Sequence, residues 1–202
     1  MTFEVWLAYV LAMLVISISP GSGCINTLST SLSYGFRPAI PAIAGLQVGL
    51  LVQLTVVGIG LGAIFATSPS AFLILQWAGV LYLVWIGVSK FIWPKVELVA
   101  GSGVVPKSVL FNRAILINIM NPKAFVFLAA FFPQFINQSA ELIPQYVILA
   151  VTSLVIDTVV MLTYAWLAHS LRPLLNSERL MRRQEQFFGM LFVLAGGLLA
   201  VY

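Results

Sequence analysis

Asp157 has the clearest potential for chemistry, because it is a carboxylate near the middle of a long apolar segment. An aspartate at the centre of a membrane helix costs about 2.5–3.5 kcal/mol on insertion scales, so it needs a compensating role. At that depth a carboxylate can take up and release a proton, or it can bind the ammonium group of a substrate. A structural ion pair or a permanently protonated acid would also explain it. We favour proton coupling by Asp157 and keep the structural explanations open.

Two polar segments that contain proline interrupt apolar stretches. The first surrounds Pro20 and the second surrounds Pro122. A proline removes a backbone donor and clashes with the preceding turn, so the helix breaks. Backbone groups freed at a break cannot face lipid, and half-helix ends carry partial charges that suit a zwitterion. The two segments therefore predict a substrate site, whereas an ordinary proline kink satisfied by neighbouring helices is the alternative.

Polar residues near the two breaks could complete such a site. Lys123 is a candidate partner for Asp157 or a contact for a substrate carboxylate, although a lysine can also extend to the membrane surface. Tyr164 follows Asp157 by two turns on the same helix face, where it could bind a ligand or lie in the interfacial aromatic belt. The candidate substrate-binding residues are Pro20, Gly21, Ser22, Asn26, Gln47, Asn121, Pro122, Lys123 and Tyr164.

The composition places these residues in a membrane protein. Hydrophobic residues make up 61% and charged residues 8% of the chain, whereas a soluble domain is about 25% charged. A single cysteine excludes an intramolecular disulfide. The only histidine, His169, is expected near the cytoplasmic edge of another span, so it is not placed to act as a base for Ser22. We therefore do not expect an enzyme, and we expect no cofactor, metal site or nucleic-acid surface.

Six apolar segments can position these residues. A helix needs roughly 20 apolar residues to cross a hydrocarbon core of about 30 Å. The apolar part of the first segment, Val5–Ser19, rises only about 22 Å, so the polar break must lie inside the bilayer; the fourth segment follows the same logic. Gly45 and Gly49 have a spacing that favours close helix packing. The expected spans are Val5–Ser31, Ala39–Ala66, Phe72–Ile92, Ala114–Ile136, Tyr146–His169 and Gln186–Tyr202.

The basic residues predict how the spans are oriented, because short cytoplasmic loops are rich in lysine and arginine. The loops after the first, third and fifth spans contain basic residues, and the loops at 67–71 and 137–145 contain none. The basic residues within or flanking these three loops are Arg37, Lys90, Lys95, Lys107, Arg113, Arg172, Arg179, Arg182 and Arg183. We therefore expect these loops in the cytoplasm and both termini outside it.

Paired landmarks predict an inverted repeat. Pro20 and Pro122 break the first and fourth spans, and Pro41 and Pro144 lie at the starts of the second and fifth. The two prolines of each pair are separated by nearly the same number of residues. An odd number of spans in each half turns the second half upside down, as in many secondary transporters. Chance similarity is the alternative, because glycine and proline are common in membrane helices.

The expected fold class is therefore an all-α membrane protein. It has six transmembrane helices in two inverted three-helix repeats, and helices one and four are broken. We expect a single transmembrane transporter domain over 1–202. Repeat one covers about 1–93, a cytoplasmic loop about 94–113 and repeat two about 114–202.

The order of these motifs resembles the lysine exporter (LysE) family of amino-acid exporters, in its homoserine/threonine-resistance (RhtB) branch. The matching stretches follow family order along essentially the whole chain: Ser19–Thr27, Ala44–Gly49, Asn121–Ala124, Phe132–Phe135, Asp157 and Tyr164-Ala165. Many members of the family carry a second proline where this chain has Ser22. The Ser22-Gly23 form, followed by Asn26-Thr27, is similar to members that export homoserine and its lactone.

The resemblance implies proton-driven export of homoserine, its lactone and threonine across the bacterial inner membrane. The expected partners are a small amino-acid substrate, protons and the lipid bilayer, and a homodimer is left open. A passive channel or facilitator would share the spans and breaks but would need no titrating group. A membrane adaptor without transport activity would leave Asp157 without a role.

Overall fold

The structure is a computed structural model, and it describes residues 1–19, 21–67 and 105–170 with a few single helical positions elsewhere. Every regular element within these residues is a helix. The third and sixth expected spans, most of the expected loop at 94–113, the arginines from Arg172 on and Pro20 lie outside the described residues. The inverted repeat therefore stays a prediction.

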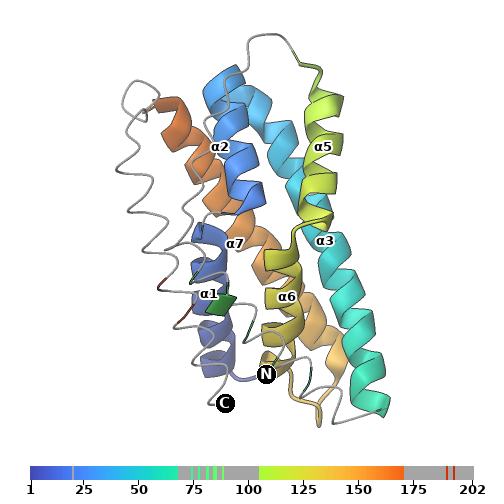
Figure 1. Ribbon diagram of the computed structural model, residues 1–202. Coiled ribbons are helices and arrows are strands. Elements are labelled where there is room, and N and C mark those ends of the chain that lie inside the picture. The colour runs from blue at the N-terminus through green and yellow to red at the C-terminus, as the bar shows by residue number, and fades with distance from the viewer. Residues whose placement is uncertain are drawn as a thin grey trace.

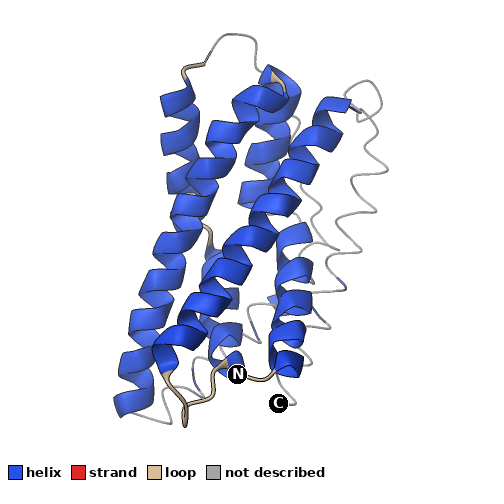
Figure 2. Cartoon of the chain, turned by 180° about the vertical axis from the view of Figure 1, so that it is seen from behind, coloured by secondary structure: helices blue, strands red, loops and turns tan. Residues whose placement is uncertain are grey.

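The described helices correspond to four of the six expected spans (Figures 1 and 2). They are α1 (Phe3–Ile18), α2 (Ser22–Tyr34), α3 (Phe36–Thr67), α5 (Lys107–Ile119), α6 (Pro122–Phe131), the 3₁₀ helix η1 (Phe132–Phe135) and α7 (Leu142–Ser170). Within these residues, Phe36–Gly60 and Leu142–Ser170 are each long and apolar enough to cross a membrane. The elements are thus those of a multi-pass membrane protein.

The two expected breaks are present. The axes of α1 and α2 bend by 53°, and those of α5 and the helical segment after it bend by 50°. Each bent pair, taken as one span, is long and apolar enough to cross. Figure 1 shows the two breaks at about the same height in the bundle. The prediction that helices one and four are broken is confirmed.

The helices extend a few residues beyond the apolar segments from which they were predicted. The clearest case is α5, which begins at Lys107 and not at Ala114. Its first two turns contain Lys107, Asn112 and Arg113, which are exposed. An apolar run marks only the part of a helix within the hydrocarbon core, so polar turns outside it are missed.

A single residue, Gly35, connects α2 to α3. Its φ of 93° lies in a region that side chains rarely adopt, and its N–H bonds to the Ser31 carbonyl. Glycine is therefore required for this reversal. The tight turn fixes α2 against α3, and α2 also packs on α5 and α7.

Two groups of buried apolar residues lie on either side of the breaks. One joins α1, α3, α6 and α7 and includes Tyr9 and Phe132. The other joins α2, α3, α5 and α7 and includes Leu46 and Met161. On α7 the residues Ile143, Val147, Val151, Val155 and Val159 repeat every four positions and are exposed, which gives that helix a face for lipid.

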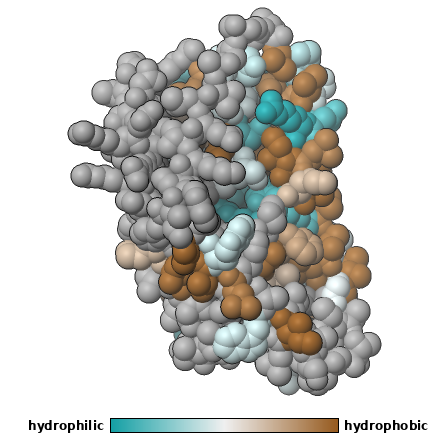
Figure 3. Space-filling model, viewed as in Figure 1, coloured by the Kyte–Doolittle hydropathy of each residue, from teal (hydrophilic) through white to brown (hydrophobic). Residues whose placement is uncertain are grey.

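Charged side chains separate to opposite ends of the described bundle. The starts of α3 and α5, with Arg37, Lys107 and Arg113, lie at one end, whereas the starts of α1 and α7, near Glu4 and Glu141, lie at the other (Figure 1). Figure 3 shows hydrophilic side chains near the end that contains the start of α5 and again about halfway down the same face, with hydrophobic side chains around them. The separation of the charged residues to the two ends agrees with a bilayer around the middle of the bundle.

Candidate functional site

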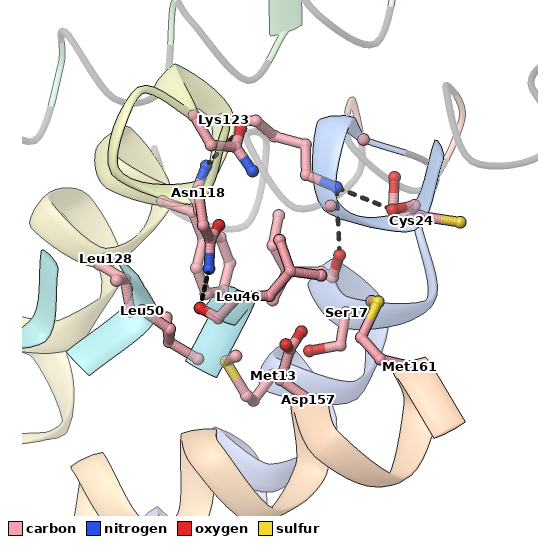
Figure 4. Close-up of a pocket in the computed structure, with 17 residues that line it drawn as sticks. Met13, Ser17, Cys24, Leu46, Leu50, Asn118, Lys123, Leu128, Asp157 and Met161 are labelled. Carbon is pink, nitrogen blue, oxygen red and sulfur yellow. Dashed lines mark hydrogen bonds between the residues drawn. The ribbon is translucent and has the colours of Figure 1, made fainter. Parts of the chain in front are cut away.

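A cavity lies at the level of the two breaks (Figure 4). Its volume is about 50 Å³, which is room for a few water molecules. The lining comes from both broken helices and from α3 and α7. It comprises Met13, Ile16, Ser17, Ser19, Gly21, Gly23, Cys24, Leu46, Leu50, Asn118, Asn121, Lys123, Ala124, Phe127, Leu128, Asp157 and Met161.

The end of α1 at the first break is held by residues from the second half of the chain. Lys123 Nζ donates hydrogen bonds to the carbonyls of Ser19 at 2.8 Å and Ile16 at 3.2 Å. The Tyr164 hydroxyl donates to the carbonyl of Ile18. The last carbonyls of a helix have no partner within it, and they carry a partial negative charge that favours a cation. Lys123 and Tyr164 therefore cap the broken end of α1.

Gly21 provides the space through which Lys123 reaches that end. A Cβ atom built on Gly21 would lie 2.8 Å from Lys123 Nζ and 3.0 Å from its Cε. The φ of Gly21 is −151°, which is extended backbone open to any residue. This glycine is thus explained by the close approach of the ammonium group and not by its backbone angles.

The end of α5 at the second break is held in the same way by the first half. Gln53 Nε2, in the middle of α3, lies 2.8 Å from the Asn118 carbonyl, 3.2 Å from that of Asn121 and 3.3 Å from that of Ile119. Asn118 Nδ2 donates to the Leu46 carbonyl at 2.6 Å. The freed backbone groups of this break are thus satisfied by protein, as a lipid surrounding requires.

We expect Gln53→Leu to destabilise the protein by about 1 kcal/mol, because the carbonyls of Asn118, Ile119 and Asn121 at the second break lose their contact with the Gln53 amide. In a protein of this size that corresponds to a fall in melting temperature of about 2–4 °C. Thermal unfolding in detergent measures it.

The matched control is Thr55→Val in the same helix. Its hydroxyl is exposed and bonds to Leu51 of its own helix. Equal melting temperatures for the Gln53→Leu and Thr55→Val variants would show that Gln53 does not support the break.

Asp157 lies near the middle of α7 and reaches the cavity from the side opposite Lys123 (Figure 4). Gln47 Nε2 donates a hydrogen bond of 2.8 Å to Asp157 Oδ2. The Ser17 hydroxyl points toward the same carboxylate. One cavity therefore contains a carboxylate and an ammonium group, the two charges that complement those of a zwitterion.

Three polar atoms in or beside the cavity are buried without a hydrogen-bond partner among the described residues. They are Ser17 Oγ, Ser19 Oγ and Gln47 Oε1. The side chains of Ser17 and Ser19 are 5% and 2% exposed. Burying such groups unpaired costs free energy, so water or a ligand is expected to bind them. A few unpaired polar atoms in a cavity whose lining is otherwise largely apolar are typical of a small-molecule site.

The family model for LysE type translocators matches residues 14–202. The chain belongs to the LysE family. The resemblance drawn from the motifs is thereby confirmed, and a family of translocators favours transport over catalysis.

Several curated proteins are similar along nearly the whole chain. A homoserine/homoserine lactone efflux protein of Salmonella typhimurium is 46% identical over 99% of this chain and 98% of its own length. An uncharacterized membrane protein of Vibrio cholerae is 43% identical over the same shares. A leucine efflux protein of an Enterobacter species is 27% identical over 92% of this chain and 90% of its own length. No solved structure matches the chain.

The structure brings together only part of the site expected for this LysE-family chain. Gly21, Asn121, Lys123 and Asp157 line the cavity, and Gln47 bonds to Asp157. Asn121 also caps α6, because its Oδ1 accepts from the Ala124 N–H at 3.4 Å. Pro20 and the side chain of Pro122 lie outside the part of the chain that the structure describes. The backbone of Pro122 begins α6 as expected.

Three expected residues lie apart from the lining. Ser22 is exposed at the start of α2, and Tyr164 donates to the carbonyl of Ile18. Asn26 is 7% exposed, and its Nδ2 atom has no partner among the described residues. Sequence spacing placed them near the break, but none of the three, Ser22 and Asn26 on α2 and Tyr164 on α7, lines the cavity.

Six polar or polarisable lining residues were not among the candidates: Met13, Ser17, Ser19, Cys24, Asn118 and Met161. The sequence could have indicated Ser17, because it is a polar residue one helical turn before the break. The methionines had none, because an apolar residue in an apolar helix carries no information about which face is inward.

Proposed function

We propose that this LysE-family chain exports small amino acids from the cytoplasm by proton antiport. The single observation that carries the proposal is the cavity at the two breaks, lined by Asp157 and Lys123. A substrate ammonium group is expected to bind toward Asp157 and Ser17, and the carboxylate toward Lys123 and Asn121. These contacts suit the two charges of an amino acid.

Homoserine and its lactone are the proposed substrates, with threonine as a further one. The 46% identical Salmonella protein is named for homoserine and its lactone, and the 27% identical Enterobacter protein for leucine. The buried, unpaired hydroxyl of Ser19 favours a substrate with a polar side chain over leucine. A neutral lactone lacks the carboxylate, so its export is expected to depend less on Lys123.

Asp157 is the proposed proton carrier. It is expected to bind a proton from outside and release it inside as the cycle turns, while the helix ends around the small cavity separate to admit the substrate. Residues in the cytoplasmic loops orient the chain in the bacterial inner membrane, with both termini outside. Arg37, Lys107 and Arg113, in the first two turns of α3 and α5, support this orientation.

Proteoliposomes test the proposal. The purified chain is reconstituted, and the vesicles are loaded with labelled homoserine, threonine, leucine or lysine. An imposed pH gradient is expected to drive uphill movement of homoserine in exchange for protons, with homoserine and threonine faster than leucine. Downhill flux without uphill flux would identify a passive facilitator, and no flux of any of the four would refute amino-acid transport.

A further inference from the structure

The broken end of α1 binds a cation that belongs to the protein itself. Lys123 Nζ lies 2.8 Å from the carbonyl of Ser19 and 3.2 Å from that of Ile16. The ammonium comes from α6, more than a hundred positions further along the chain, so these contacts form only in the folded protein. Asp157 lines the same cavity from the side opposite Lys123.

These oxygens form the kind of environment that binds a free cation in other transporters. In discontinuous membrane helices, unwound carbonyls and the C-terminal ends of half-helices coordinate sodium ions or protons. Hard cations take carbonyl and carboxylate oxygens as ligands. Here a charged amine on a flexible stem occupies that position, and Gly21 leaves it the necessary space, because a Cβ there would lie 2.8 Å from Nζ.

We propose that Lys123 is a tethered cation, which occupies the place at the end of α1 where a free coupling cation would otherwise bind. Two consequences follow. Transport by the wild-type protein requires no sodium ion. Removing the lysine side chain leaves a site between the two carbonyls and Asp157 that binds a small free alkylammonium ion.

The first test is ligand-dependent stability of the full chain in detergent. Ethylammonium is the probe, because it supplies an N–H donor and a positive charge. Tetramethylammonium, which has no N–H group, and sodium are compared at equal ionic strength. We expect ethylammonium to raise the melting temperature of Lys123→Ala by about 2–4 °C in a saturable manner, and to leave the wild type unchanged.

Lys107→Ala is the matched control, because it removes the same charge at an exposed position at the start of α5. Lys123→Ser is measured in parallel, since it leaves similar space and provides a polar group if the alanine variant does not accumulate. An ethylammonium response no larger in the Lys123 variants than in Lys107→Ala would overturn the proposal. A response to sodium as well as to ethylammonium would support the proposal, because carbonyl oxygens also bind hard cations. A response to tetramethylammonium equal to that to ethylammonium would show a general effect of cations and would also overturn it.

The second test is homoserine exchange in proteoliposomes and rests on the proposed function. The pH is equal on both sides, because alkylamines collapse pH gradients. We expect Lys123→Ala to lower the exchange rate by about tenfold. Ethylammonium is expected to raise the exchange rate of this variant by at least about threefold. Wild-type exchange that depends on sodium would refute the proposal. If the wild type exchanges no amino acid, the proposed function fails, while the stability shift still decides whether Lys123 is a tethered cation.

Discussion

Asp157→Asn is expected to lower pH-driven uphill export by at least about a hundredfold, while the protein still inserts and folds. The asparagine has the same shape, and its carbonyl oxygen can still accept the hydrogen bond that Gln47 donates to Asp157. The substitution removes the negative charge and with it the ability to carry a proton. Uphill homoserine movement in proteoliposomes under an imposed pH gradient measures the effect.

Glu141→Gln is the matched control, because Glu141 is exposed at the start of the same segment and lies far from the cavity. It removes one carboxylate charge and is expected to keep the wild-type rate. Downhill exchange separates two roles of Asp157. Loss of uphill export with exchange retained identifies proton coupling, whereas loss of both identifies a substrate contact. Uphill export by Asp157→Asn at the wild-type rate would refute both roles.

The breaks could be predicted because a length argument forces them. The apolar residues before Pro20 are too few to cross a bilayer, so the polar segment must lie within it. The bends of 53° and 50° follow that argument. The importance of Asp157 could be predicted for a similar reason, because an ionisable side chain within the hydrocarbon core is costly whichever way it points.

The partners of the polar side chains could not be predicted. Lys123 had three plausible roles in the sequence, and the structure shows a fourth, which is to cap the carbonyls of Ile16 and Ser19. Gln53 was an unremarkable polar residue within an apolar span, yet it supports the end of α5. Spacing along one helix indicates which residues share a face, but it does not indicate which distant backbone carbonyl lies opposite.

The two breaks are held by each other's half of the chain. Lys123, from the second half, caps the end of α1, and Gln53, from the first half, caps the end of α5. Because Lys123 lies at the second break and holds the first, a movement at the second break disturbs the donor that holds the first. We infer that the two broken helices respond together when a substrate enters, which suits a transporter better than two independent kinks would.

Gly45→Ala is expected to have the largest effect on folding. A Cβ on Gly45 would lie 2.2 Å from the Phe111 carbonyl oxygen and 3.0 Å from the Ala114 Cβ. The obstacle is backbone of α5, the helix that packs most extensively on α3, so neither helix can yield without moving away. Overpacking a tight contact costs about 1–3 kcal/mol, and a backbone clash costs more.

Gly60→Ala is the matched control, because it makes the same change in the same helix where no atom lies within 4 Å of the new Cβ. We expect Gly60→Ala to purify like the wild type. Gly45→Ala is expected to lower the melting temperature by at least about 6 °C or to prevent accumulation of folded protein. Because α3 also holds Gln47 and Gln53, separating it from α5 would loosen both the second break and the contact with Asp157. Equal melting temperatures for the two alanine variants would mean that α3 and α5 do not pack this closely, and the donors that α3 supplies to the site would then lie elsewhere.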